Sequence, residues 1–363
     1  MYENPFKPTF GSEPLFLAGR ERIIGDIIGG LGNQVGDPNR STIFVGSRGS
    51  GKTVLLLCIA EEAKRIGWIP VMVTAHTGML DSVLEQALLL AQNLLAPETK
   101  RRVAAIQAGG FGISLEAVKE KGASWRVQMS RLLEALNAQG VGLLICVDEV
   151  RADMDEMVTL VANYQHFVGE HREVALLMAG LPGKVMPMFQ HETISFLRRA
   201  FQHRIGAVPL AEARMAMRKT IEASGRSIDD SLLHDAAMCS RGFPFLIQLV
   251  GYHIWRQSPN IQRISAVDVQ AGVECAEVDM ENMILENTIR ELSARDLDFL
   301  IAMSPDQEYS QIGEIAKRAG MSQGMAGQYR IRLIQRGLIA DKGRGKVGFE
   351  LPFLQEYIVK HFS

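Results

Sequence analysis

Short apolar runs alternate with amphipathic stretches over the first 210 residues of the chain. The almost wholly apolar runs are typical of strands buried on both faces of a parallel sheet. They lie at 42–46, 68–75, 141–150, 174–180 and 205–210. The stretches with helical spacing of apolar residues lie at 23–31, 52–67, 80–95, 124–140 and 154–170. This alternation predicts an α/β core in which helices cover a parallel sheet.

The pattern changes after residue 210, where no further long strand is predicted. Helices are predicted at 211–225, 229–242 and 244–257, as a small all-α lid, and a long connecting helix at 266–292. Three short helices follow, then a Gly/Lys-rich hairpin at 340–351 and a final helix, an order typical of a winged helix. We expect domains at residues 1–210, 211–290 and 291–363.

A glycine-rich stretch, GSRGSGKT at 46–53, separates the first predicted strand from a helix and matches G-x-x-x-x-G-K-[ST]. In such loops, backbone N–H groups and the helix N-terminus surround phosphates. Lys52 would contact the β- and γ-phosphates of ATP, and the Thr53 hydroxyl would ligate Mg²⁺. The residues expected to hold ATP or ADP are Gly46, Ser47, Arg48, Gly49, Ser50, Gly51, Lys52, Thr53 and Val54.

Two acidic residues end the apolar run at 141–150. Asp148 would hold Mg²⁺ through water, and Glu149 would orient or deprotonate the attacking water. A pair of solvated acids at a strand end is the simpler alternative. Their position about 95 residues after the phosphate loop, within a strand–helix alternation, favours the catalytic interpretation.

These motifs together resemble those of AAA+ P-loop ATPases, in particular the initiator-like ATPases of the origin-recognition kind that carry a carboxy-terminal winged helix. The resemblance rests on PLFLAGRERI, GSRGSGKT, LLICVDEV, RGFPFLIQLVG and the terminal winged helix. The first and fourth of these stretches also resemble those of the STAND switch ATPases, in which a lid GxP contacts the adenine. Here this implies Gly242 to Pro244, with Pro244 against the nucleotide, and Arg20 near the base.

The resemblance implies further polar groups that this sequence supports unevenly. An arginine finger would come from Arg198, Arg199 or Arg204, with Arg199 as the catalytic candidate. The strand after the acidic pair ends in Ala179 and Gly180, where a polar sensor would stand. The lid offers only Arg241 ahead of an apolar stretch. A site without these sensors predicts slow hydrolysis or a nucleotide-controlled switch.

Positive charge is concentrated in the last segment. Between Ser310 and Lys346, eight cationic residues stand against two acidic ones, although the whole chain of 363 residues has a net charge of −2. Base edges or phosphates of duplex DNA could be contacted by Gln323, Gln328, Tyr329, Arg330, Arg332, Lys342, Arg344 and Lys346. Ile331, Leu333 and Ile334 are predicted to face the core. A winged helix that binds a protein is the alternative.

The cysteines and the lengths of the apolar runs indicate the cellular compartment. Four scattered cysteines without metal-ligand spacing predict reduced thiols in a cytoplasmic protein, and no apolar run is long enough to span a membrane. We therefore expect an ATPase that uses ATP/ADP and Mg²⁺, binds duplex DNA, and forms a homo-oligomer dependent on nucleotide or DNA. Two alternatives remain: a STAND-like switch with a protein partner, and a loader on a mobile element.

Overall fold

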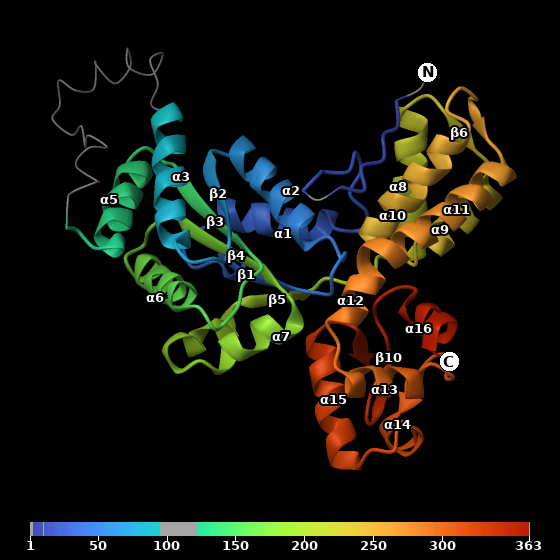
Figure 1. Cartoon of the computed structure of the whole chain (residues 1–363). Helices are drawn as coiled ribbons and strands as arrows, with labels where there is room; N and C mark the ends of the chain where they lie inside the picture. The colour runs from blue at the N-terminus through green and yellow to red at the C-terminus, as the bar shows by residue number, and fades with distance from the viewer. Residues whose placement is uncertain (1–2, 10, 95–121, 363) are drawn as a thin grey trace, which may run out of the picture.

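The computed structural model describes residues 3–9, 11–94 and 122–362. The stretch 109–123, for which the sequence suggests a hairpin or a loop, lies almost entirely outside the described residues. Within them, an α/β core is followed by a helical lid and a carboxy-terminal unit beneath the lid (Figure 1). The predicted fold class, an α/β core with a parallel sheet and many helices, is confirmed.

The core sheet has five strands in the order β2-β3-β4-β1-β5, and every neighbouring pair is parallel. The strands are β1 (Ser41–Val45), β2 (Trp68–Thr74), β3 (Gly142–Asp148), β4 (Val174–Gly180) and β5 (Phe201–Arg204). Because β1 lies between β4 and β5, the loop after it leaves the carboxyl edge of the sheet between these two strands. Ligands of open α/β sheets bind at this edge.

The fifth strand lies four residues earlier than the apolar run 205–210 predicts. It is an edge strand with a largely exposed sequence, so its composition lacks the apolar signal of a central strand. The Ile205 N–H still donates to the Val45 carbonyl at 2.7 Å, and the chain then leaves the sheet at Gly206. The apolar residues after this point, such as Val208, are buried in the core of the lid instead.

Helices cover both faces of the sheet (Figure 1). On one face lie α1 (Glu21–Gly32) and α2 (Lys52–Arg65); on the other lie α3 (Met79–Leu94), α5 (Trp125–Asn137) and α6 (Asp155–Gly169). Before β5, the chain forms α7 (Pro182–Val185) and two 3-10 helices, η4 (Met186–Gln190) and η5 (Glu192–Arg199). The predicted helices of the core are confirmed where the structure describes them.

The lid consists of α8 (Leu210–Ala223), α9 (Asp230–Cys239), α10 (Pro244–Gln257) and α11 (Ala266–Met280). A π-helical turn, η6 (Glu281–Leu285), and α12 (Glu286–Arg290) extend α11 as the predicted connector. Contrary to the expectation of a purely helical lid, β6 (Ser227–Ile228) and β7 (Arg263–Ile264) form a short parallel pair. Two-residue strands carry too little periodicity to be recognised in a sequence.

The carboxy-terminal unit contains α13 (Ala294–Met303), α14 (Ile312–Arg318), α15 (Gln323–Gln335) and α16 (Leu354–Phe362). A small antiparallel sheet in the order β8-β10-β9 joins them; its strands are β8 (Ser310–Gln311), β9 (Ile339–Asp341) and β10 (Lys346–Phe349). The β9–β10 hairpin is the wing, and α15 occupies the place of a recognition helix.

One hydrophobic core runs through the lid, the connector and the winged helix. It includes Trp255 of α10, Leu285 of η6, Phe299 of α13 and Leu333 of α15, each at most 1% exposed. The lid and the winged helix are therefore packed together through the connector.

The N-terminal segment 3–9 lies along the lid, away from the sheet (Figure 1). The Phe6 ring is 2% exposed and occupies the space that a side chain at Gly251 would need. The Asn4 amide donates to the Tyr252 carbonyl at 3.1 Å, and the Lys7 N–H donates to the Gln248 side chain at 3.0 Å. This segment ties the beginning of the chain to α10.

Candidate nucleotide site and its contact with the winged helix

The phosphate loop follows β1 and leads directly into α2. Gly51 stands at the start of the helix with a φ of 87°, a left-handed conformation that glycine adopts without a steric penalty. A Cβ on Gly51 would lie 3.3 Å from the Pro244 ring of the lid. Pro244 therefore lies against the phosphate loop, and its contact with the adenine stays a prediction.

Lys52 is the first residue of α2 and is 7% exposed. Its Nζ donates to the carbonyls of Gly46 and Ser47 at 3.0 and 2.8 Å, so the amine folds back over the loop. Burial lowers the pKa of this amine, against the attraction of Glu149 and Asp148, which raises it. A buried cation with carboxylates nearby provides the positive charge that a polyphosphate requires.

Thr53 and Asp148 meet across the site. The Thr53 Oγ1 donates to the Asp148 Oδ2 at 2.5 Å, and the Glu149 N–H donates to the other oxygen of Asp148 at 2.9 Å. Two adjacent hard oxygen atoms suit the partial ligand shell of Mg²⁺, which usually keeps several waters and phosphate oxygens. The residues present therefore fit the predicted metal.

Glu149 is exposed and has a φ of 54°, which is uncommon outside glycine. Such backbone strain persists where the surroundings fix it, and it often marks functional sites. Here the side chain leaves the end of β3 at the edge that carries the phosphate loop. This placement is compatible with the predicted role of positioning water.

Arg20 lies beside the lid rather than in solvent. Its Nη2 donates to the Gly206 carbonyl, and it is 9% exposed; burial lowers the pKa of its guanidinium. Arg20 therefore fixes the chain where it passes from β5 to the lid.

The two sensor positions offer no polar group to the site. A Cβ on Gly180 would lie 2.9 Å from Val185 and 3.0 Å from Val150, so a larger side chain does not fit there. Arg241 stacks on the Phe353 ring at 4.1 Å and pairs with Glu356 of α16. The lid arginine is thus directed to the winged helix.

The three candidate finger arginines differ in their contacts. Arg198 donates to the Phe189 carbonyl at 2.7 Å, whereas Arg199 is exposed at the end of η5. Arg204 is exposed at the end of β5 and lowers the pKa of Asp341, after larger contributions from Gly343 and Arg330. Arg199 remains the candidate for contact with a neighbouring subunit.

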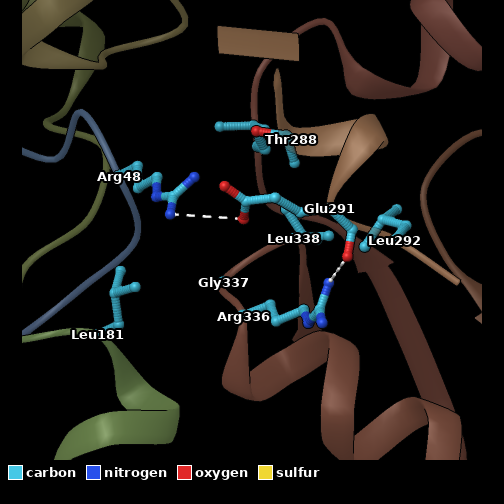
Figure 2. Close-up of a pocket in the computed structure, with 9 residues that line it drawn as sticks. Arg48, Leu181, Thr288, Glu291, Leu292, Arg336, Gly337 and Leu338 are labelled. Atoms are coloured by element: carbon cyan, nitrogen blue, oxygen red, sulfur yellow. Dashed lines mark hydrogen bonds and ion pairs between the residues drawn. The ribbon is translucent and has the colours of Figure 1, made fainter. Parts of the chain in front are cut away.

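The winged helix contacts the phosphate loop itself. Gly337, at the end of α15, has a φ of 72°, and a Cβ there would lie 3.1 Å from the Cα of Ser47. The Arg48 Nη2 lies 3.6 Å from the Glu291 carboxylate, and the Arg336 Nη1 donates to the Glu291 carbonyl at 2.9 Å (Figure 2). A cavity of about 60 Å³ lies at this contact. It is lined by Arg48, Glu291, Arg336 and Gly337, together with Leu181, Thr288, Leu292, Leu338 and Leu351.

The sequence predicts neither Glu291 nor Gly337 as part of this site. Glu291 follows the connector without a recognisable motif, and Gly337 has only the signature of a glycine that ends a helix. Their proximity to Ser47 and Arg48 depends on the packing of segments more than 240 residues apart. No local pattern carries that information.

The candidate DNA-contacting residues fall into two groups. Arg330 pairs with Asp341 at 2.7 Å, and Arg332 donates to Asp296 and Ser293 at 2.7 and 2.9 Å. Two of the others make side-chain contacts within the unit: Tyr329 lies under Arg332, and Lys346 lies 3.9 Å from the Tyr309 ring. The exposed candidates are Gln323, Gln328, Lys342 and Arg344.

Ile331 does not face the core as predicted; it is 54% exposed. Leu333 is fully buried and Ile334 half-buried. Three apolar residues within four positions cannot all lie on one side of a helix. In the structure, Leu333 and Ile334, nearer the end of α15, face the core.

Solved structures share this architecture over nearly the whole chain. A Walker-type ATPase of Pyrococcus abyssi superposes with a TM-score of 0.70, covering 94% of this chain and 96% of its own, at 12% identity. The ORC2 protein of Aeropyrum pernix, in its ADP form, gives a TM-score of 0.54 at 14% identity, covering 98% of each chain. The chain has the fold of an initiator-like AAA+ ATPase.

A third AAA+ neighbour, Cdc6p of Pyrobaculum aerophilum, gives a TM-score of 0.50 at 16% identity, covering 97% of this chain and 96% of its own. A protein-family model described as "Domain of unknown function (DUF8462)" matches residues 282–358. The search of curated proteins gives no match. In the part of this AAA+ fold that the structure describes, no helix has both the length and the apolar character to traverse a membrane.

Proposed function

We propose that this protein is an ATP-binding, slowly hydrolysing AAA+ ATPase that binds duplex DNA through its winged helix. Nucleotide state regulates DNA binding or assembly. The observation that carries the proposal is the direct contact between the phosphate loop and the winged helix, at Ser47 with Gly337 and Arg48 with Glu291. A movement of the phosphate loop on nucleotide binding would therefore act directly on the end of α15.

The nucleotide part of the proposal rests on the geometry of the loop. Lys52 would exchange its bonds to two loop carbonyls for bonds to phosphate, and Thr53 and Asp148 would hold Mg²⁺. When bound, Mg²⁺ would neutralise charge on the phosphates. Glu149 would orient the attacking water and accept its proton.

Slow hydrolysis follows from what surrounds these groups. A polar sensor does not fit at Gly180, and Arg241 is held by Glu356 and Phe353. Groups that stabilise the transition-state charge can contribute about 10³–10⁵ in rate when supplied by an arginine. Arg199 of a neighbouring subunit could supply one in a homo-oligomer that forms with ATP or DNA.

The DNA part of the proposal rests on exposed cations of the winged helix. Lys342 and Arg344 extend from the wing tip, and Lys317 lies on α14. Each phosphate that such residues neutralise releases counterions, so log affinity should fall steeply with log salt. A flat salt dependence would contradict phosphate contact.

The deciding experiment measures duplex-DNA affinity of the full chain by fluorescence anisotropy without nucleotide, with ADP and with ATP. The wild type should change its dissociation constant between states, and Lys52→Ala should stay at the nucleotide-free value. Glu291→Gln removes the charge facing Arg48 at nearly constant volume and should reduce the difference. Its matched control is Glu286→Gln, whose ion pair with Arg290 lies within α12.

Equal DNA affinity of the wild type in all three states would refute the regulation. The same docking also favours a second candidate, a STAND-like switch in which ATP/ADP exchange releases the winged helix toward a protein. That candidate predicts nucleotide binding lost in Lys52→Ala but no duplex binding at low salt. The anisotropy experiment therefore separates the two candidates.

A further inference from the structure

One exposed stripe of α15 carries no charged residue. Gly324, Gln328 and Ile331 follow one another at helical spacing, on the side opposite the fully buried Ala326 and Leu333. All three are exposed, Ile331 at 54%. Gln323 and Met325, in the first turn, are exposed as well and lie on the two flanks of this stripe, two turns before Arg330 and Arg332 respectively.

The arginines of this region are held by other parts of the protein. Arg330 pairs with Asp341 of β9, and Arg332 with Asp296 of α13. Arg336, just after the helix, donates to the Glu291 carbonyl. All three guanidinium groups therefore already have a hydrogen-bond acceptor within the protein, although the side chains of Arg330 and Arg332 are 26% and 42% exposed.

Exposed cations lie on elements that adjoin α15, and α15 itself has no acidic residue. Lys342 and Arg344 lie at the wing tip, and Lys317 is on α14. At the other end of the helix, Lys184 is exposed on α7, whose neighbouring Gly183 packs closely against Gln335. This distribution suits a duplex whose phosphates lie beside the cations while the uncharged side of α15 faces the bases.

We propose that α15 reads A·T base pairs in the major groove, an inference that rests on the proposed DNA binding. Gln323 and Gln328 form the bidentate contact that an amide makes with adenine N6 and N7. Ile331 and Met325 pack against the C5-methyl group of thymine. Guanine is read most often by a free arginine or lysine, and this side of the helix presents neither.

The test uses the full chain, in its DNA-binding nucleotide state, and three duplexes with equal length and equal flanks. One has an A·T core, one a G·C core, and in the third deoxyuridine replaces every thymidine of the A·T core. The A·T duplex should bind about tenfold or more tightly than the G·C duplex. Loss of the buried thymine methyl should weaken wild-type binding about fourfold.

Two variants at exposed positions assign the contacts. Ile331→Ala should reduce the difference between thymine and uracil, and Gln328→Ala should reduce the difference between A·T and G·C. Val359→Ala is the matched control, since Val359 is 48% exposed and belongs to α16, outside α15 and the wing. Lys342→Ala should weaken binding to all three duplexes equally, as a phosphate contact would.

Equal, salt-sensitive affinity for the A·T and G·C duplexes would overturn the A·T inference and leave DNA binding standing. An unchanged uracil effect in Ile331→Ala would remove the assigned methyl contact and overturn the proposed reading by α15. Absence of binding to every duplex at low salt would overturn DNA binding and this inference together, and would favour a protein ligand for the same surface.

Discussion

Gly337→Ala tests whether the contact between the winged helix and the phosphate loop transmits nucleotide state. At a φ of 72°, the new methyl group is strained, which costs about 1–2 kcal/mol. It also approaches the Cα and Cβ of Ser47 at 3.1 Å, closer than ordinary van der Waals contact. The end of α15 must therefore move away from the loop by a few tenths of an ångström.

The strain and the contact can be separated by a matched control. Gly140 has the same φ of 72°, and nothing lies within 4 Å of the position its Cβ would take. Gly140→Ala should lose the same 1–2 kcal/mol of unfolding free energy, measured by urea titration, without touching the site.

The assay for Gly337→Ala is the ratio of DNA dissociation constants with ADP and with ATP. Couplings between sites are typically 1–3 kcal/mol, or about 5- to 150-fold. The ratio should therefore approach one in Gly337→Ala, a change of about fivefold or more, and stay at the wild-type value in Gly140→Ala. A wild-type ratio in both variants would refute the role of the contact.

Three further predictions concern separate parts of the chain. Glu149→Gln should retain ATP binding and lower steady-state hydrolysis about 10²- to 10⁴-fold, and a loss under tenfold would exclude it as general base. Gly251→Ala should displace Phe6 from the lid and lower the unfolding free energy by about 2–3 kcal/mol; unchanged proteolysis of the N-terminal segment would contradict this. Arg332→Ala should cost about 2–3 kcal/mol because it leaves the buried carboxylate of Asp296 without its cation. Burial would raise the pKa of Asp296, but the hydrogen bond from Arg332 holds it below its usual range. The wild type therefore loses this stabilisation as pH falls through that lowered pKa, and its advantage in urea titrations should narrow in acid rather than in base.

The nucleotide loop was predictable because its information is local. The glycines, Lys52 and Thr53 lie within eight residues, between a buried strand and a helix. The partner of Thr53, Asp148, was predictable from a second apolar strand with an acidic end. Both features depend on hydrophobic periodicity and on chemistry that tolerates few residue types.

In the winged helix, the side-chain contacts could not be predicted from the sequence. Its element order was predictable, but the engagement of Arg332 by Asp296, 36 residues earlier, was not. The local sequence around a helical arginine is the same whether its guanidinium contacts a DNA phosphate or a buried carboxylate. The orientation of Ile331 likewise depends on which side of α15 packs against the rest of the unit.

The core shared by the lid and the winged helix bears on how this architecture can be inherited. The DUF8462 match begins at residue 282, inside the connector and not at α13. Leu285 and Thr288 of the connector are 0% and 5% exposed, so this stretch packs inside the protein. Cutting after Arg290 would expose apolar surface on both pieces, and the separated fragments should aggregate. The lid, the connector and the winged helix should therefore be exchanged between related proteins only together, as one unit with a common core.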